Sequence, residues 1–204
     1  MHTLPRSFYT RNTLTVAKEL LGKILVRKVG KVLLTGIVVE TEAYLYNDPA
    51  SHSFRGMTER SKVMFGEGGH LYVYFTYGMH HCANVVTQNE GRGEAVLLRA
   101  VEPIDGIDVM MKNRNVRNEN KDDRHLVDAG HLKNLTNGPA KLAQAFGLTR
   151  VESGTDLLSN AIYFTQGLSV PKSKIISATR IGISVATGKK WRFYLKDNTW
   201  ISKP

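Results

Sequence analysis

The chain contains only one cysteine, Cys82, among its 204 residues. An intramolecular disulfide is therefore excluded, and with it the small secreted scaffolds that several disulfides hold together. Long apolar runs are also lacking, since the stretch 95–98 is bounded by Glu94 and Arg99 and is far too short to cross a bilayer. The first residues lack the apolar stretch of a signal peptide. We therefore expect a cytoplasmic protein with no membrane partner.

Acidic residues are outnumbered, with 18 Asp and Glu against 28 Lys and Arg, which gives a formal net charge of +10. This excess favours a polyanionic partner, although the basic residues are dispersed along the chain and form no tail. The content of 42% hydrophobic and 23% charged residues is that of an ordinary globular protein, and the length fits a single domain over residues 1–204. Charge alone therefore favours a polyanionic partner and does not indicate which reaction, if any, the protein catalyses.

Turn and capping signals divide the chain into short elements. The expected elements are a helix over 13–21, strands over 24–29 and 33–45, a tyrosine-rich hairpin over 71–86, a strand over 95–101, a helix over 104–112, a helix from 137–139 to 147, and strands over 175–186 and 191–201. The hydrophobic pattern lapses only over 113–133, which we interpret as a mobile surface insertion. Strands at both ends with helices irregularly between them predict an α+β fold with a largely antiparallel sheet.

The predicted strand 36–45 carries two glutamates and a tyrosine on one face. Because strand side chains alternate, Glu40, Glu42 and Tyr44 point to the same side. Two neighbouring carboxylates repel each other unless one is exposed, paired or protonated. An exposed polar face is the commoner explanation of such a pattern, and for Glu40 we expect only a structural role. The aromatic ring and the loop with His52 that follow favour instead a positioned general base.

The tyrosine-rich hairpin places Tyr72 and Tyr74 on one face and Tyr77 beside the glycine of its turn. Aromatic residues at alternate strand positions more often serve packing than ligand binding. A tyrosine at an exposed tip is harder to explain by packing, and it could act as a wedge between stacked bases. The adjacent residues 80–82 (His-His-Cys) lack a second ligand cluster, so we expect no metal site there.

Several motifs occur in order over nearly the whole chain. They are VETEAYL at 39–45, HS at 52–53, LYVY at 71–74, YGM at 77–79, Cys82 and Asn84, VLLRA at 96–100, EP at 102–103, GPAKL at 138–142, RIG at 180–182 and WRFY at 191–194. Together they resemble the alkyladenine (3-methyladenine) DNA glycosylase family, of the type that includes the mammalian enzyme. The resemblance implies one domain with a curved, mostly antiparallel sheet, peripheral helices and a protruding β-hairpin.

The same resemblance implies a monofunctional base-excision enzyme that flips an alkylated or deaminated purine out of duplex DNA. It implies a monomer that needs no cofactor and no metal. Glu42 matches the general base that activates the attacking water, and Arg99 and the backbone near Ile181 match the groups beside that water. Cleavage passes through an oxocarbenium-like sugar, so a carboxylate at this position suits the reaction.

Five further residues match positions that bind the flipped base or replace it in the helix. Tyr44, His52 and Tyr74 match the residues that sandwich the base, and Tyr77 matches the side chain that fills the vacated stack. Asn84 matches the asparagine that opposes the exocyclic amino group of guanine. The resemblance leaves open which of 3-methyladenine, 7-methylguanine, hypoxanthine and ethenoadenine are substrates.

Two alternatives remain open at this point. The first is a non-enzymatic nucleic-acid-binding module that uses the same basic and aromatic surface, which leaves Glu42 without a role. The second is a glycosylase with an added lyase activity through a lysine Schiff base. No lysine lies within the motifs of Glu42 and Tyr74, which argues against the lyase.

Overall fold

The computed structural model describes residues 3–116 and 132–204. The strands in these residues are β1 (Ile24–Val29), β2 (Val32–Tyr44), β3 (Leu71–Thr76), β4 (His80–Val86), β5 (Ala95–Asp105), β6 (Ile162–Thr165), β7 (Ile175–Ala178) and β8 (Arg192–Leu195). The helices are α1 (Arg6–Tyr9), α2 (Thr13–Glu19), α3 (Ile107–Asn113) and α5 (Pro139–Ala145), with short 3-10 turns η1 (Lys62–Phe65), η2 (Arg150–Glu152) and η3 (Lys172–Lys174). In this part of the chain no helix is long and apolar enough to cross a membrane.

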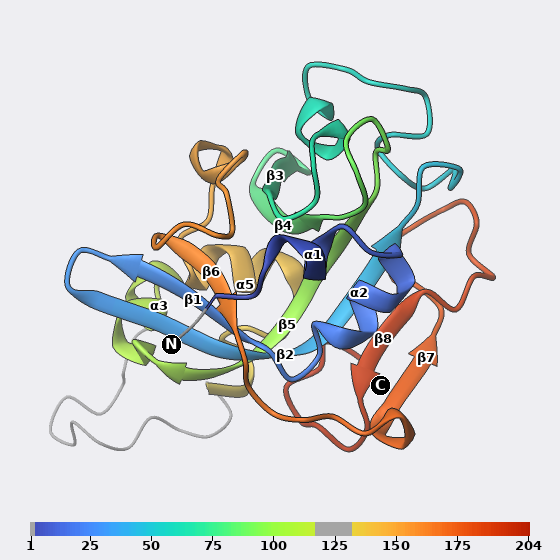
Figure 1. Cartoon of the computed structure of the whole chain (residues 1–204). Coiled ribbons are helices and arrows are strands. Elements are labelled where there is room, and N and C mark those ends of the chain that lie inside the picture. Colours follow the sequence, from blue (N-terminus) through green and yellow to red (C-terminus); the bar gives the residue numbers. More distant parts are fainter. Residues whose placement is uncertain (1–2, 117–131) are drawn as a thin grey trace, which may run out of the picture.

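All eight strands join one curved sheet, and every pairing between neighbouring strands is antiparallel (Figure 1). The order along the sheet is β3-β4-β5-β2-β1-β6, and β8 and β7 branch from β2. This arrangement confirms the predicted α+β class. Most of the predicted insertion 113–133 lies outside the described residues, so that prediction stays untested.

The long strand β2 has two different neighbours along one edge. Its first half pairs with β1 and its second half, over Glu40–Glu42, pairs with β8, while β5 runs along the other edge. The register with β5 shifts on both sides of Glu40, and such bulges bend a strand. Glu40 and Glu42 therefore lie in the interior of the sheet and not at its edge.

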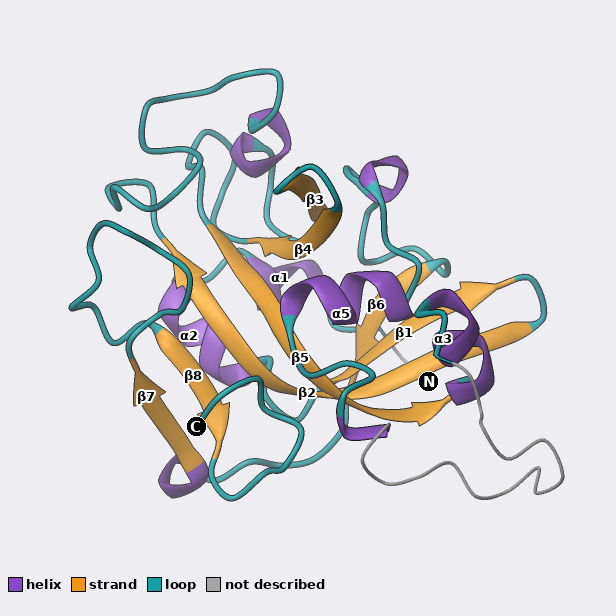
Figure 2. Cartoon of the chain, turned by 180° about the vertical axis from the view of Figure 1, so that it is seen from behind, coloured by secondary structure: helices purple, strands orange, loops and turns teal. Residues whose placement is uncertain are grey.

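Helices cover the two faces of the sheet. Helix α2 packs on one face, where the hydroxyl of Thr41 donates to the carbonyl of Ala17, and α5 lies on the opposite face against β4 and β5 (Figures 1 and 2). The side chain of Asn12 caps α2, as predicted, and Pro139 begins α5. Most of the buried apolar side chains form one core between these layers.

The two C-terminal strands are shorter than predicted. The strand expected over 175–186 ends at Ala178, and the strand expected over 191–201 is only β8. After β7 the chain leaves the sheet, because the side chain of Arg180 forms a buried ion pair with Asp48. After β8 it turns at Asp197, which has a positive φ of 61°.

Three further differences concern short elements. The helix expected to begin at Ile104 begins at Ile107, since β5 continues to Asp105 and Gly106 makes the turn. The sequence analysis missed α1, which has only four residues, and β6, which also has four. Elements of one turn or four residues carry too few periodic positions to be recognised.

Candidate active site

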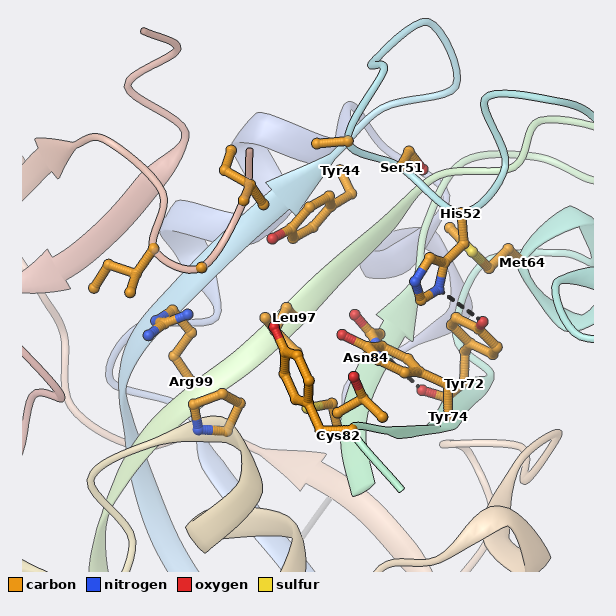
Figure 3. Close-up of a pocket in the computed structure, with 17 residues that line it drawn as sticks. Tyr44, Ser51, His52, Met64, Tyr72, Tyr74, Cys82, Asn84, Leu97 and Arg99 are labelled. Carbon is orange, nitrogen blue, oxygen red and sulfur yellow. Dashed lines mark hydrogen bonds between the residues drawn. The ribbon is translucent and has the colours of Figure 1, made fainter. Parts of the chain in front are cut away.

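A cavity of about 360 Å³ opens beside β2 and the β3–β4 hairpin. Its wall is formed by Tyr44, residues 50–52, the hairpin, Leu97 and Arg99 of β5, the start of α5, and residues 181–183. Figure 3 shows Tyr44 and Arg99 on one side of this space, and His52, Tyr72 and Tyr74 on the other. Segments far apart in the sequence therefore build one cavity lined by aromatic and polar side chains.

Glu42 lies behind this wall and is completely buried. Its Oε1 accepts the backbone N–H of Ile181 at 2.8 Å and lies 3.1 Å from Nη1 of Arg99. Its Oε2 accepts the hydroxyl of Tyr44 at 2.9 Å. Because all three partners line the cavity, they hold the carboxylate at the cavity's edge in a fixed orientation.

Burial raises the pKa of the Glu42 carboxyl, and the nearby charge of Glu40 adds to this effect. Arg99, the Ile181 N–H and the Tyr44 hydroxyl oppose the shift, because each stabilises the anion. Tyr44 is held in its protonated form, since burial and the neighbouring carboxylate raise its pKa. The result is a carboxylate with a greater affinity for protons than an ordinary glutamate, which suits a general base.

Glu40 is also completely buried, so the commoner explanation of the pattern, an exposed polar face, does not apply to this strand. Its Oε1 accepts from Nε of Arg99, Nη1 of Arg192 and the hydroxyl of Ser202, each at 3.0 Å. Its Oε2 accepts the backbone N–H of Ser202 at 2.6 Å. Two carboxylates and two guanidinium groups thus compensate each other inside the sheet, and Arg99 touches both carboxylates.

A second buried ion pair joins Arg180 to Asp48, and both side chains are fully inaccessible. The guanidinium of Arg180 also donates to the carbonyl of Ala43 and lies 4.6 Å from the ring centre of Tyr44. Since Arg180 precedes Ile181, this pair fixes the backbone that donates to Glu42. The sequence analysis gave Arg180 and Asp48 no role, and the position of Arg180 beside Ile181 was the one local signal.

The aromatic side of the cavity is a cluster of three rings. The ring of His52 lies edge-on to Tyr74 with centroids 4.4 Å apart, and its Nδ1 is 3.0 Å from the hydroxyl of Tyr72 (Figure 3). Burial of the ring, with the charge of Arg60, lowers the pKa of His52 to about 4, so the imidazole is neutral at pH 7. The sequence analysis placed Tyr72 beside Tyr74 but did not name it as part of the site.

Asn84 faces this cluster from β4. It pairs in register with Tyr72, and its Nδ2 donates to the Tyr72 carbonyl at 3.1 Å. The direct partner of Tyr74 is Cys82, so Asn84 lies diagonally and not directly across from Tyr74. This hydrogen bond fixes the orientation of the buried Asn84 amide, which lines the cavity.

Tyr77 stands at the tip of the hairpin with 80% of its surface exposed. Its φ of 51° is unfavourable for a residue with a bulky side chain, and Gly78 with φ of 67° follows it in the turn. Strained, exposed aromatic residues of this kind gather at functional sites. The structure thus brings to one cavity the predicted residues Tyr44, His52, Tyr74, Tyr77, Asn84 and Arg99, with Glu42 directly behind them.

No group of three or more His, Cys, Asp and Glu side chains that could hold a metal ion occurs among residues 3–116 and 132–204. Residues 80–82 share one strand, in which neighbouring side chains point to opposite faces.

Comparisons with known proteins agree with this geometry. A protein of Carboxydothermus hydrogenoformans, named provisionally as a 3-methyladenine DNA glycosylase, is 48% identical over 98% of this chain and 98% of its own length. A protein of Methanoculleus marisnigri with the same name is 45% identical over 98% of this chain and 99% of its own. A third, from Francisella tularensis, is 44% identical over 94% of both chains. The model of the methylpurine-DNA glycosylase family matches residues 7–199, and the chain therefore belongs to that family.

Proposed function

We propose that this protein is a DNA-repair glycosylase that hydrolyses the bond between a damaged purine and its deoxyribose in duplex DNA. The observation that carries the proposal is the anchoring of Glu42 by Tyr44, Arg99 and Ile181 at the edge of an aromatic cavity. The family and the names of the relatives support the same activity, with 3-methyladenine as one substrate. We further propose that the protein acts as a monomer.

A base inside a duplex is out of reach of this cavity, so the nucleotide has to leave the stack. Extrusion costs about a few kcal/mol, and less for a damaged or mispaired base. We assign Tyr44, His52 and Tyr74 to the binding of the extruded base, since their rings line the cavity. Tyr77, exposed at the hairpin tip, would fill the gap that the base leaves. The formal charge of +10 favours the approach of DNA.

In the chemical step, Glu42 orients a water molecule and accepts its proton as the water oxygen bonds to C1′ of the sugar. The bond from C1′ to the base nitrogen breaks, and its electron pair leaves with the base. The sugar carries positive charge in the transition state, and the carboxylate of Glu42 stabilises that charge. Arg99 holds the carboxylate in place through the contact of 3.1 Å.

Two features support hydrolysis without a Schiff base and the rejection of normal guanine. Among the described residues that line the cavity none is a lysine, which favours hydrolysis without a Schiff base. Asn84 is buried in the cavity wall with its side chain fixed by Tyr72, so it can oppose the exocyclic amino group of guanine. We therefore assign Asn84 to the discrimination against normal guanine.

The direct test is incubation of the protein with duplexes that contain hypoxanthine, ethenoadenine or 7-methylguanine, followed by detection of the free base. Release of the base with an intact abasic strand supports the proposal. Borohydride trapping on the same duplexes gives a covalent adduct only if a lysine acts as nucleophile. Tight binding to damaged DNA without any base release would instead identify a non-enzymatic binding module.

A further inference from the structure

Two of the four tyrosines that line the cavity, Tyr44 and Tyr74, have a guanidinium group over the ring. The guanidinium carbon of Arg180 lies 4.6 Å from the ring centre of Tyr44, and that of Arg60 lies 5.3 Å from the ring centre of Tyr74. Tyr44 and Tyr74 line the cavity, whereas neither arginine does. Each of these two rings therefore borders the cavity and also contacts a cation that does not line it.

The two guanidinium groups differ in whether a nearby carboxylate balances their positive charge. Arg180 is buried and paired with Asp48, so its charge is balanced within a few ångströms. Arg60 is exposed; its guanidinium donates to the carbonyl of Phe75 at a long 3.5 Å and also contacts the hydroxyl of Tyr72. No carboxylate of residues 3–116 or 132–204 forms an ion pair with it. Arg60 therefore presents a positive charge beside Tyr74 that no ion pair among the described residues balances.

The charge of Arg60 shifts the pKa of two side chains that line the cavity. It lowers the pKa of the His52 imidazole, in the same direction as burial of that ring. It also lowers the pKa of the Tyr72 hydroxyl, against the larger effect of burial. A positive potential that destabilises a protonated histidine in the cavity wall acts in the same way on a positively charged base beside it.

We propose that Arg60 is a specificity-determining residue that shifts the enzyme's preference toward neutral damaged purines and away from cationic N-alkylated purines. The inference rests on the proposed function of this cavity. A cationic base gains extra attraction from the face of a tyrosine ring. A guanidinium over the same ring competes for its electron density and repels the bound cation, whereas it has little effect on a neutral purine such as hypoxanthine or ethenoadenine.

The test compares Arg60→Gln with the wild type on a cationic and a neutral lesion in the same duplex sequence. Single-turnover release of 7-methylguanine and of hypoxanthine is measured for each protein. We expect Arg60→Gln to raise the ratio of the 7-methylguanine rate to the hypoxanthine rate by roughly 2- to 5-fold, the scale of one exposed cation–π contact. Arg60→Lys, which keeps the charge, should leave the ratio close to that of the wild type.

Arg150→Gln is the matched control. Arg150 is also exposed and lies 6.0 Å from the ring centre of Phe75, a ring next to Tyr74 in sequence that does not line the cavity. It should leave the ratio unchanged while removing the same charge. An equal fall of both rates in Arg60→Gln would overturn the inference, because it would assign Arg60 to a backbone phosphate. An unchanged ratio with unchanged rates would overturn it as well.

Failure of the proposed function would be recognised separately. If the wild type released neither base, the glycosylase activity itself would be wrong, and the preference assigned to Arg60 would be wrong with it. If the wild type releases both bases, only the ratio decides about Arg60. Because Arg60 is exposed in a loop, its substitution is expected to leave the melting temperature unchanged, and that measurement accompanies the rates.

Discussion

Arg99 bridges Glu40 and Glu42: its Nε lies 3.0 Å from Oε1 of Glu40 and its Nη1 lies 3.1 Å from Oε1 of Glu42. The two carboxylates are on the same face of β2 and both are inaccessible to water. Glu42 contacts Ile181 of the cavity wall, whereas Glu40 contacts Arg192 and Ser202 near the C-terminus. Glu40 thus fixes the guanidinium that Glu42 uses, so the two glutamates have different roles despite their similar burial.

Glu42→Gln is expected to abolish base release and to leave the fold and the binding of damaged DNA intact. The amide cannot accept the proton of the water, and general-base catalysis contributes about 10²–10⁴-fold to rates. The stability should fall less than in Glu40→Gln, because burial, which disfavours the ionised form, outweighs the contacts that stabilise the Glu42 carboxylate. Single-turnover excision and the melting temperature are measured together. Excision near the wild-type rate would remove Glu42 from its proposed role.

Glu40→Gln is the matched control on the same strand, and it is expected to act first on stability. Its carboxylate compensates Arg99 and Arg192 in a buried site, and removal of one partner of a buried ion pair costs about 3–5 kcal/mol. The melting temperature should therefore fall further than in Glu42→Gln, because Glu40 pairs with two guanidinium groups and Glu42 with one. Any fall in the excision rate should result from displacement of the Arg99 guanidinium, which also contacts Glu42. Equal stability of the two variants would contradict the division of roles.

The rate of excision is expected to fall in acid at a higher pH than an ordinary glutamate would produce. Glu42 must be ionised to act as a base, and its folded-state pKa is raised by burial, so the rate is lost as the pH falls through that raised value. An unperturbed glutamate titrates near about 4.3. His52 does not contribute to this limb near neutrality, because its pKa is lowered to about 4.

The single-turnover pH profile of the wild type and of His52→Gln checks this assignment. Both should show the same acid limb, with the rate constant of His52→Gln lower at every pH. If the acid limb shifted or disappeared in His52→Gln, it would reflect the titration of His52 and not that of Glu42. Stability gives a second measurement. Between pH 6.5 and about 4 His52 becomes protonated in the unfolded chain but not in the folded one, so acidification over this range should cost the wild type more stability than it costs His52→Gln.

Ser202 is expected to support catalysis from the C-terminal end of the chain. Its hydroxyl accepts from Nη2 of Arg99 at 3.1 Å and donates to Glu40, so Ser202→Ala removes one hydrogen bond from the guanidinium that holds Glu42 and one from the carboxylate of Glu40. Loss of a hydrogen bond worth about 1 kcal/mol corresponds to roughly 5-fold in rate. Removal of Pro204 alone is the control, and it should have no effect. Wild-type rates in Ser202→Ala would show that Arg99 is held without the tail.

The predictions from sequence succeeded where the signals are local. Strand β1 lies between Gly22 and Gly30 and was predicted to the residue, and alternation along β2 placed Glu40, Glu42 and Tyr44 on one face. Long-range pairing could not be predicted in this way. Arg180 is 132 residues from Asp48, and Ser202 is 162 residues from Glu40.

The same limit explains the incorrect strand ends. The sequence over 175–186 is apolar enough to continue as a strand, but the buried pair of Arg180 and the left-handed Gly182 end it after Ala178. The resulting loop carries Ile181 to Glu42, so the site depends on the interruption. Burial of Glu40 was likewise hidden, because its partners come from separate segments that the strand pattern does not connect.

Tyr77→Ala is expected to impair extrusion of the base and not the chemical step. The exposed ring at the hairpin tip is assigned to the vacated position in the stack, so its loss should lower the population of flipped base. The defect should shrink when the lesion lies opposite a mismatch or a gap, since the unstacking cost is then smaller. Removal of a side chain that is 80% exposed and held at φ 51° should not lower the melting temperature.

Asn84→Ser is the matched variant on the other strand of the hairpin, and it should respond in the opposite way. Its side chain is buried and bonded to Tyr72, so its role is selection inside the cavity, and a mismatch should not rescue it. Guanine-type bases should gain relative to adenine-type bases, whereas Tyr77→Ala should keep the rank order of substrates. Single-turnover rates on ethenoadenine, hypoxanthine and 7-methylguanine, each in matched and mismatched duplexes, separate the two effects. If both variants instead lost all activities in proportion to their melting temperatures, the hairpin would serve only stability, because neither a defect in extrusion nor one in selection scales with unfolding.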